Sequence, residues 1–181
     1  MLLVKPVTFF RSLKENPTDI RPFLVAYGMP LIILAAAGRM TRIMLLYGAG
    51  EETLRGDQLA GIFLIGLVAY ALSVWLGAYG IARIAPAFRS DAGHDKTMLM
   101  VMLAYTPYLL AQPLSLIYPY MPFFQVAAMI YTVYLFSKGA RELLNVATGK
   151  LLGFTLISYF LIFGISHLAT LMLTELFIFA G

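Results

Sequence analysis

The sequence predicts an all-α, polytopic membrane protein: a bundle of five transmembrane helices with a short N-terminal amphipathic helix. Hydrophobic residues make up 61% of the 181 residues and charged residues 12%. Soluble domains are closer to half apolar and a quarter charged, so the composition excludes an ordinary soluble domain. The mean hydropathy of +0.84 agrees with this. The length accommodates about five spans of roughly 20 residues each, with their connections.

Residues 1–22 are expected to form a cytoplasmic segment built around an amphipathic helix. In a helix from Pro6 to Asn16, Phe9, Phe10 and Leu13 fall on one side and the charged residues mostly on the other. Such a helix lies in the headgroup region, with its cations near anionic lipid. A soluble stub before the first span is the alternative. Early lysine and arginine residues interrupt the N-terminus, so a cleavable signal peptide is not expected.

Residues 23–181 form the expected membrane domain, with spans at about residues 23–47, 58–84, 97–118, 122–144 and 151–179. Along the second span, Ala69, Ser73 and Gly77 recur every four residues. A stripe of small residues like this lets another helix approach closely. The last span would be roughly 43 Å long as one helix. Because a hydrocarbon core is only about 30 Å thick, this span is expected to tilt, bend or project.

The third span contains prolines in apolar surroundings. Pro107 and Pro113 each remove a backbone donor and clash with the carbonyl four residues earlier. In hydrocarbon no water replaces the lost bonds, so the carbonyls near Leu103 and Leu109 need a neighbouring helix, a hydroxyl or a trapped water. We therefore expect an inner, proline-kinked helix that is surrounded by its own protein and ends in a tight turn at Tyr118 to Pro122.

The lysine and arginine residues are unevenly distributed. Ten of the thirteen lie in the N-terminal segment and in the connections after the second and fourth spans, and the other three are Arg39, Arg42 and Arg55. Cytoplasmic loops carry the excess of positive residues. This predicts a cytoplasmic N-terminus and an external C-terminus. Charges confined to such loops give no support to nucleic-acid binding, and the lack of cysteine excludes disulfides and thiolate metal sites.

Several motifs follow one another in the second half of the chain. A basic loop at residues 83–96 precedes Leu103-Ala-Tyr-Thr-Pro107, the proline-marked turn, Tyr131-Thr-Val-Tyr-Leu135, and Lys138-Gly-Ala-Arg-Glu-Leu-Leu144, which leads to Thr148-Gly-Lys150. Over roughly residues 80–165 this order resembles the Yip (Ypt-interacting protein) domain family. The loop has Ala92-Gly93 where a Gly-Gly pair is common. The long cytosolic N-terminal region of eukaryotic members, with its Asp-Leu-Tyr-Gly-Pro motif, is missing, so the resemblance points to the compact prokaryotic branch.

The resemblance implies an integral protein of a prokaryotic cytoplasmic (inner) membrane that acts in membrane organisation or as a partner-binding scaffold. The expected partners are the lipid bilayer, a cytoplasmic or membrane protein, and a second copy of the chain. The contact surfaces would be the N-terminal helix and the cytoplasmic loops. The candidate contact residues are Arg83, Arg89, Asp91, His94, Asp95, Lys138, Arg141 and Lys150.

Residues capable of catalysis or metal binding do not fall into a recognised pattern. Asp91, His94 and Asp95 lack the three or four fixed ligands and the supporting shell of a metal site. Residues 145–151 lack the first glycine of a phosphate loop and the hydroxyl residue after its lysine. Neither histidine has a serine and a carboxylate at a spacing that argues for a triad. No enzymatic activity, cofactor or metal is therefore expected.

Four charged or titratable residues of the first and last expected spans are further candidates for function. Arg39 and Arg42 share a helix face, and intramembrane cations are functional candidates by default. Alternatively, both snorkel to the outer headgroups. His167 and Glu175 lie on a similar face of the last span, about 12 Å apart along its axis. Glu175 either reaches outer water or pairs with one of the two arginines.

A small transporter or channel for an ion or small solute is the alternative function. Broken helices often mark binding sites near the midplane. Tyr105, Thr106, Pro107 and Gln112 place polar groups at such a depth. The lack of an obvious inverted repeat favours the scaffold.

Overall fold

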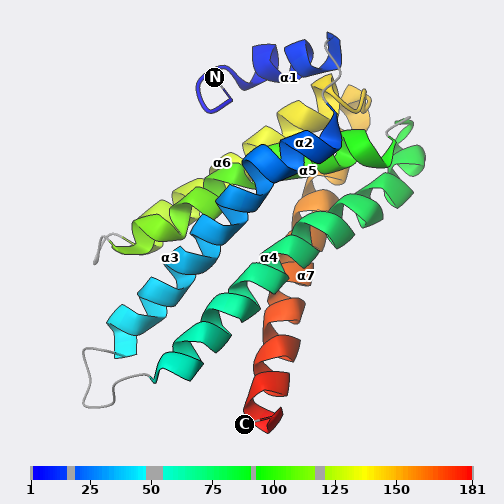
Figure 1. The fold of residues 1–181 in the computed structure, drawn as a ribbon. Helices are drawn as coiled ribbons and strands as arrows, with labels where there is room; N and C mark the ends of the chain where they lie inside the picture. Colours follow the sequence, from blue (N-terminus) through cyan, green and yellow to red (C-terminus); the bar gives the residue numbers. More distant parts are fainter. Residues whose placement is uncertain (1, 16–18, 48–54, 91–92, 117–120, 181) are drawn as a thin grey trace.

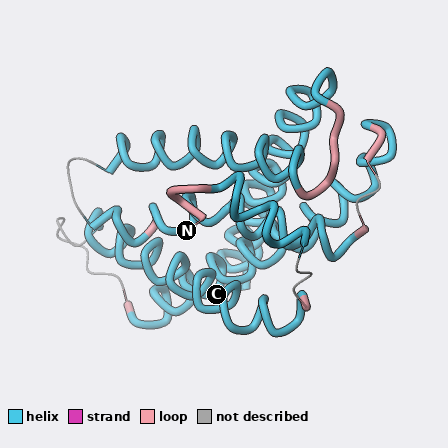
Figure 2. Tube along the Cα trace, turned by 90° about the horizontal axis from the view of Figure 1, so that it is seen from above, coloured by secondary structure: helices cyan, strands magenta, loops and turns pink. Residues whose placement is uncertain are grey.

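The structure is a computed structural model, and it describes the whole chain except residues 1, 16–18, 48–54, 91–92, 117–120 and 181. The described residues form helices and short connections without a strand (Figure 2). The helices are α1 (Pro6–Glu15), α2 (Ile20–Phe23), α3 (Met29–Tyr47), α4 (Gly56–Ile84), α5 (His94–Ala111), α6 (Met121–Glu142) and α7 (Leu151–Ala180). A π-helical turn, η1 (Leu24–Gly28), joins α2 to α3, and the short 3-10 turns are η2 (Ala85–Phe88), η3 (Pro113–Leu116) and η4 (Thr148–Lys150). The predicted all-helical class is confirmed.

Three stretches of helix are long and apolar enough to cross a membrane: Ile20–Leu46, Gly56–Phe88 and Thr148–Leu176. They correspond to the first, second and last expected spans. The third and fourth expected spans also form helices, α5 and α6, at nearly the predicted positions. Those two helices fall outside this group of three. α5 opens with His94-Asp95-Lys96, and α6 ends in a charged turn.

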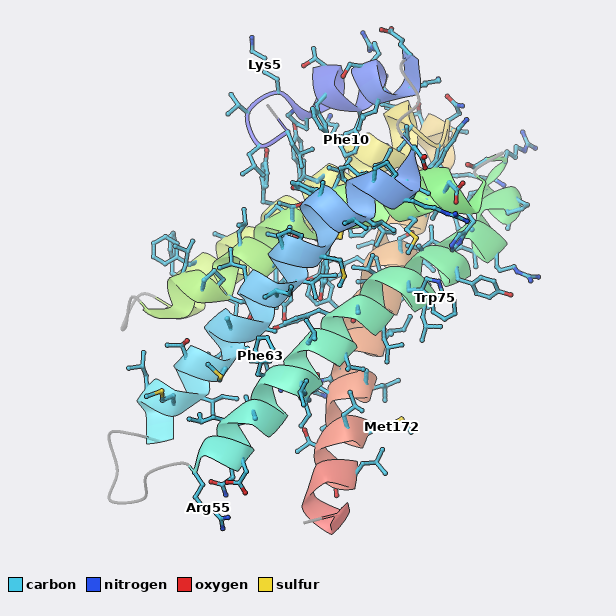
Figure 3. All side chains as sticks on the ribbon, viewed as in Figure 1. Lys5, Phe10, Arg55, Phe63, Trp75 and Met172 are labelled. Atoms are coloured by element: carbon cyan, nitrogen blue, oxygen red, sulfur yellow. The ribbon has the colours of Figure 1, made fainter. Side chains whose placement is uncertain are left out.

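The outer surface of the bundle is strongly apolar. Trp75 on α4 and Met172 on α7 point away from the other helices (Figure 3), and they are 54% and 67% exposed. Large exposed apolar side chains also occur along α3 and α6. Contiguous exposed apolar surface on this scale is typical of a protein whose solvent is lipid.

The most extensive helix packing in the bundle is between α4 and α7. The two helices lie side by side and cross at an angle (Figure 1). Ala69, Ser73 and Gly77 are all buried along α4. A Cβ at Gly77 would meet the side chain of Ile162 on α7. The predicted small-residue stripe therefore lies in a helix interface, as expected.

α5 is the buried helix of the bundle, as predicted. Every residue from Thr97 to Thr106 is buried, and α3, α4 and α6 all contact α5. The helix continues through Pro107 and ends at Ala111, so it stops before Pro113 rather than at the first proline. The predicted tight turn after it lies mostly outside the described residues.

The backbone tightens where α5 ends. The Gln112 amide N–H donates to the Leu109 carbonyl (3.3 Å), which is one of the carbonyls that the sequence expects a proline to free. The Gln112 side-chain amide donates to the Tyr108 carbonyl (3.4 Å). A backbone bond and a side chain of the same turn therefore supply the partners that water cannot supply in hydrocarbon.

α1 lies across one end of the bundle, against α6 (Figure 1). Phe10 points from α1 into the bundle (Figure 3) and is completely buried. Its ring lies over Gly139, where a Cβ would meet both Phe10 and Met100. The apolar side predicted from the sequence thus packs on the protein itself.

Candidate functional site

A glycine beside an arginine fixes the position of the first candidate site. A Cβ at Gly38 would overlap the backbone of Gln112 and Pro113, so α3 touches the end of α5 at this level. Arg39 and Arg42 follow Gly38 on the same part of α3. Both side chains are partly buried.

Each arginine contacts a different helix. Arg39 Nη1 donates to Thr170 Oγ1 of α7 (3.2 Å), and Arg42 Nη1 lies 3.5 Å from Gln125 Oε1 of α6. The stem of Arg39 passes α4 at Gly66, where a Cβ would stand 3.4 Å from Arg39 Cδ. The two arginines therefore bridge α3 to α4, α6 and α7 and lie between helices.

Aromatic side chains border the two guanidinium groups. Tyr70 on α4 is buried, and both Tyr70 and Tyr108 on α5 lie within electrostatic reach of both arginines. The Tyr108 ring stacks on Tyr105 with centroids 5.0 Å apart, and both rings meet Phe163 edge-on. We call the set Arg39, Arg42, Tyr70, Tyr108, Gln125 and Thr170 the arginine cluster.

The arginine cluster contains two cations and no carboxylate. Within the described residues the ion pairs are Arg11–Glu142, Arg141–Glu142 and Arg55–Asp57. Glu175 is exposed and forms no ion pair in this part of the chain, so the hypothetical pairing with Arg39 or Arg42 is not seen. His167 is exposed as well. Neutral oxygen atoms are thus the observed hydrogen-bond partners of both guanidinium groups.

The four candidates on the third span separate into two groups. Tyr105 is completely buried and Gln112 is 3% exposed, and both adjoin the arginine cluster through Tyr108. Thr106 instead shares a hydrogen bond with the hydroxyl of Tyr27 on η1 (2.8 Å). Pro107 is partly buried between them. Tyr105 and Gln112 thus lie next to the arginine cluster, whereas Thr106 bonds to η1.

The second candidate site is the opposite end of the bundle, where α1 and the connections after α4 and α6 are bonded together. Ser90 Oγ donates to the Leu144 carbonyl (2.5 Å) and Lys150 Nζ to the Ala87 carbonyl (2.8 Å). These two bonds join the connection after α4 to the connection after α6. α1 is bonded to the same region through the Arg11–Glu142 ion pair (3.3 Å) and the hydrogen bond from Lys14 Nζ to Asn145 Oδ1 (2.6 Å).

We call this surface the basic end, because it contains most of the cations of the chain. They are Lys5, Arg11, Lys14, Arg21, Arg83, Arg89, Lys96, Lys138, Arg141 and Lys150. Lys5, of the basic end, and Arg55, which is not part of it, lie at opposite ends of the molecule in Figure 3. The connections that the sequence assigns to one membrane side therefore form one surface.

Several predicted contact residues of the basic end are held by neighbours. The Arg83 guanidinium lies 4.9 Å from the Tyr79 ring centroid and donates to its hydroxyl (2.6 Å). Lys138 Nζ lies 5.3 Å from the Tyr134 ring. Arg141 and Lys150 take part in the pairs given above. Arg89, His94 and Asp95 are exposed, and Asp91 lies outside the described residues.

Sequence reasoning missed Tyr70, Tyr108, Gln125 and the two glycines beside the arginine cluster. A partial signal existed, because Gly38 directly precedes Arg39 and Gly66 lies one turn before Tyr70. A glycine near a large polar residue in an apolar helix marks a place where another element comes close. Which element comes close depends on helix packing, which the sequence pattern did not provide.

Comparison with known proteins covers nearly the whole chain. The family model of the Yip1 domain matches residues 1–171. This range extends beyond the motif-bearing residues 80–165 and includes α1, the basic end and every member of the arginine cluster. No curated protein and no solved structure matches the chain. Because the family model spans far more than half of the sequence, the chain belongs to the Yip1 domain family of membrane proteins.

Proposed function

We propose that this protein is a five-span, non-enzymatic scaffold of a prokaryotic cytoplasmic membrane that binds a cytoplasmic protein through its basic end. The observation that carries the proposal is the bonding of α1 and the two connections into one cationic surface. A surface held together in this way is available to a partner without further ordering, which lowers the entropic cost of binding.

Five crossings fit the lengths of the helices. α5 and α6 contain 18 and 22 residues, which correspond to about 27 and 33 Å at 1.5 Å per residue. These lengths are close to the thickness of a hydrocarbon core of about 30 Å. The charged residues of both helices lie at the basic end, and the positive-inside rule assigns that end to the cytoplasm. The N-terminus is then cytoplasmic and the C-terminus external.

Some cations of the basic end are exposed and unpaired within the described residues. Arg89 and Lys96 are exposed, and in the described part of the chain their side chains form no hydrogen bond or ion pair. His94 is exposed between them in sequence. Charge complementarity of this kind steers association and selects partners. We therefore expect a partner with an acidic face.

Reversing the charges of Arg89 and Lys96 tests the proposal. The protein and its R89E/K96E variant are isolated from membranes in a mild detergent, with R55E as a matched control on the opposite end. The expected result is an acidic cytoplasmic protein, identified by mass spectrometry, that accompanies the wild type and R55E but not R89E/K96E. Its recovery should fall as salt increases. Equal recovery with all three proteins, or with none, contradicts binding through the basic end.

Transport of an ion or small solute is the second candidate, and the location of Tyr105 and Gln112 beside the arginine cluster favours it. Purified protein in liposomes separates the two functions. Flux that Tyr105→Phe or Gln112→Ala abolishes supports transport. Flux that these changes do not affect, or no flux, leaves the scaffold as the better account.

A further inference from the structure

We propose that Arg39 and Arg42 form a binding site for a phosphate group, supplied either by a phospholipid headgroup or by free phosphate. The site lies at the end of the bundle opposite the basic end and does not depend on the proposed partner binding. It rests on three features of the arginine cluster: its unneutralised charge, its donor geometry and its distance from the end of the apolar stretch.

The arginine cluster carries positive charge that no carboxylate among the described residues neutralises. Two guanidinium groups are partly buried among apolar helices, and their observed partners are the neutral oxygens of Thr170, Gln125 and Tyr70. A charge inside a low-dielectric bundle is costly unless an opposite charge accompanies it. Of the described carboxylates at this end, Asp57 pairs with Arg55 (3.3 Å) and Glu175 is exposed. An external anion would supply the missing counter-charge.

The donors suit a phosphate in particular. A guanidinium carries five N–H donors in a planar fork that matches the oxygens of phosphate two at a time. Arg39 bonds α7 while Arg42 bonds α6, and each of these bonds uses a single N–H, so both forks keep further donors. The hydroxyls of Tyr70 and Tyr108 lie within reach of the same charges. Phenol hydroxyls can donate further hydrogen bonds to phosphate oxygens.

The location allows a headgroup to reach the site. In the apolar stretch Ile20–Leu46, Arg39 lies about 28 Å from the first residue and about 10 Å from the last, at 1.5 Å per residue. Arg42 is one turn nearer to the last residue. Arginine side chains at this depth are met by local thinning of the bilayer and by snorkelling. A phosphate therefore approaches from the leaflet opposite the basic end.

The direct test measures anion binding to purified protein in a neutral detergent. The probes are dioleoylphosphatidylglycerol, dioleoylglycerol with the same acyl chains but no phosphate, and inorganic phosphate. Phosphatidylglycerol is expected to raise the unfolding temperature of the wild type and of R55Q, whereas R39Q/R42Q should bind it at least about tenfold more weakly. R39K/R42K keeps the charge but loses the fork, and should bind with intermediate affinity. Dioleoylglycerol should have no effect.

The same experiment distinguishes the sources of the phosphate. Binding of phosphatidylglycerol alone supports a lipid headgroup, and equal protection by inorganic phosphate supports a soluble ligand. Equal responses of the wild type and R39Q/R42Q to both phosphate-bearing probes overturn the proposal.

A second measurement needs no variant and covers the case in which R39Q/R42Q does not fold. Photoactivatable phosphatidylglycerol is cross-linked to the wild type in liposomes, and the labelled peptides are identified. Labelling of the peptides that contain Gln125 and Thr170 is the expected result. Labelling confined to the basic end would overturn the lipid form of the proposal, and failure of phosphate to protect the wild type would then overturn the soluble form.

Discussion

At the scale of single residues, the arginine cluster depends on two glycines, because a side chain at either position would block a close contact between helices. Gly38 lets the end of α5 reach the backbone of α3, and Gly66 lets the Arg39 stem pass over α4. Without these close approaches the two arginines would be held further from α6 and α7. In a membrane, helix contacts rely on such packing because lipid provides no hydrophobic driving force between helices.

Gly38→Ala should therefore destabilise the protein, whereas Gly164→Ala should not. The added methyl at Gly38 overlaps backbone, which cannot move aside as a side chain can, and overpacking of this kind typically costs about 1–3 kcal/mol. At Gly164, also within a helix, nothing lies within 4 Å of the new atom. Thermal unfolding in detergent measures both. A Gly38→Ala protein as stable as the Gly164→Ala protein would contradict the close contact between α3 and η3.

The residue scale is also where sequence reasoning reached its limit. It selected Arg39 and Arg42 because charge in an apolar segment is visible in the sequence. It did not connect them to Tyr70, Tyr108 or Gln125, which come from helices far apart in the chain. Tyrosine and glutamine are ordinary residues of membrane helices, and only their position beside a guanidinium distinguishes them.

At the scale of elements, α1 is held against the bundle by two kinds of interaction, the burial of Phe10 and the Arg11–Glu142 ion pair. Phe10 is completely buried, whereas the side chain of Arg11, in the ion pair with Glu142, is 59% exposed. Losing a buried phenylalanine side chain costs about 3–5 kcal/mol. An exposed ion pair contributes less than about 1 kcal/mol because solvent screens it. Apolar burial therefore holds α1, and the ion pair orients it.

Phe10→Ala should release α1 from α6, and Arg11→Ala should leave it attached. Amide hydrogen exchange along residues 6–15 measures the difference, because a detached helix of ten residues is too short to persist alone in water. Fast exchange in Phe10→Ala with slow exchange in Arg11→Ala is the expected result. Thr8→Ala, at an exposed position of α1, is the control for substitution itself. Comparable exchange in Phe10→Ala and Thr8→Ala would show that α1 is held by other contacts.

The helices themselves were largely predictable, because each is an apolar run bounded by charged or proline residues. The end of α5 was less so. Two prolines were equally able to end the helix, and the structure ends it before Pro113, where the Gln112 N–H and side chain satisfy the nearby carbonyls. Pro107 stays inside the helix, with Thr106 bonded to the Met102 carbonyl (3.0 Å) one turn earlier. The choice depends on local hydrogen bonding that a count of prolines does not reveal.

At the scale of the whole molecule, the helices are not equal in length. α3, α4 and α7 belong to the three stretches that are long and apolar enough to cross a membrane, and the α5–α6 pair packs among them. Two arrangements give the same location for the basic end: α5 and α6 each cross the membrane, or they enter and return as a hairpin. The residues near the turn between them decide which arrangement holds, since only a full crossing brings them to the outer surface.

Single cysteines in this cysteine-free chain test the orientation and the number of crossings together. Cysteines at Gly56, Gly93 and Gly149 meet nothing within 4 Å, and Phe123, at the start of α6, is 72% exposed. With a membrane-impermeant maleimide, Gly56→Cys and Phe123→Cys should react in intact cells. Gly93→Cys and Gly149→Cys should react only after permeabilisation, because the positive-inside rule places them in the cytoplasm. Reaction of Gly149→Cys in intact cells would reverse the orientation. Reaction of Phe123→Cys only after detergent solubilisation would reduce five crossings to three with an internal hairpin.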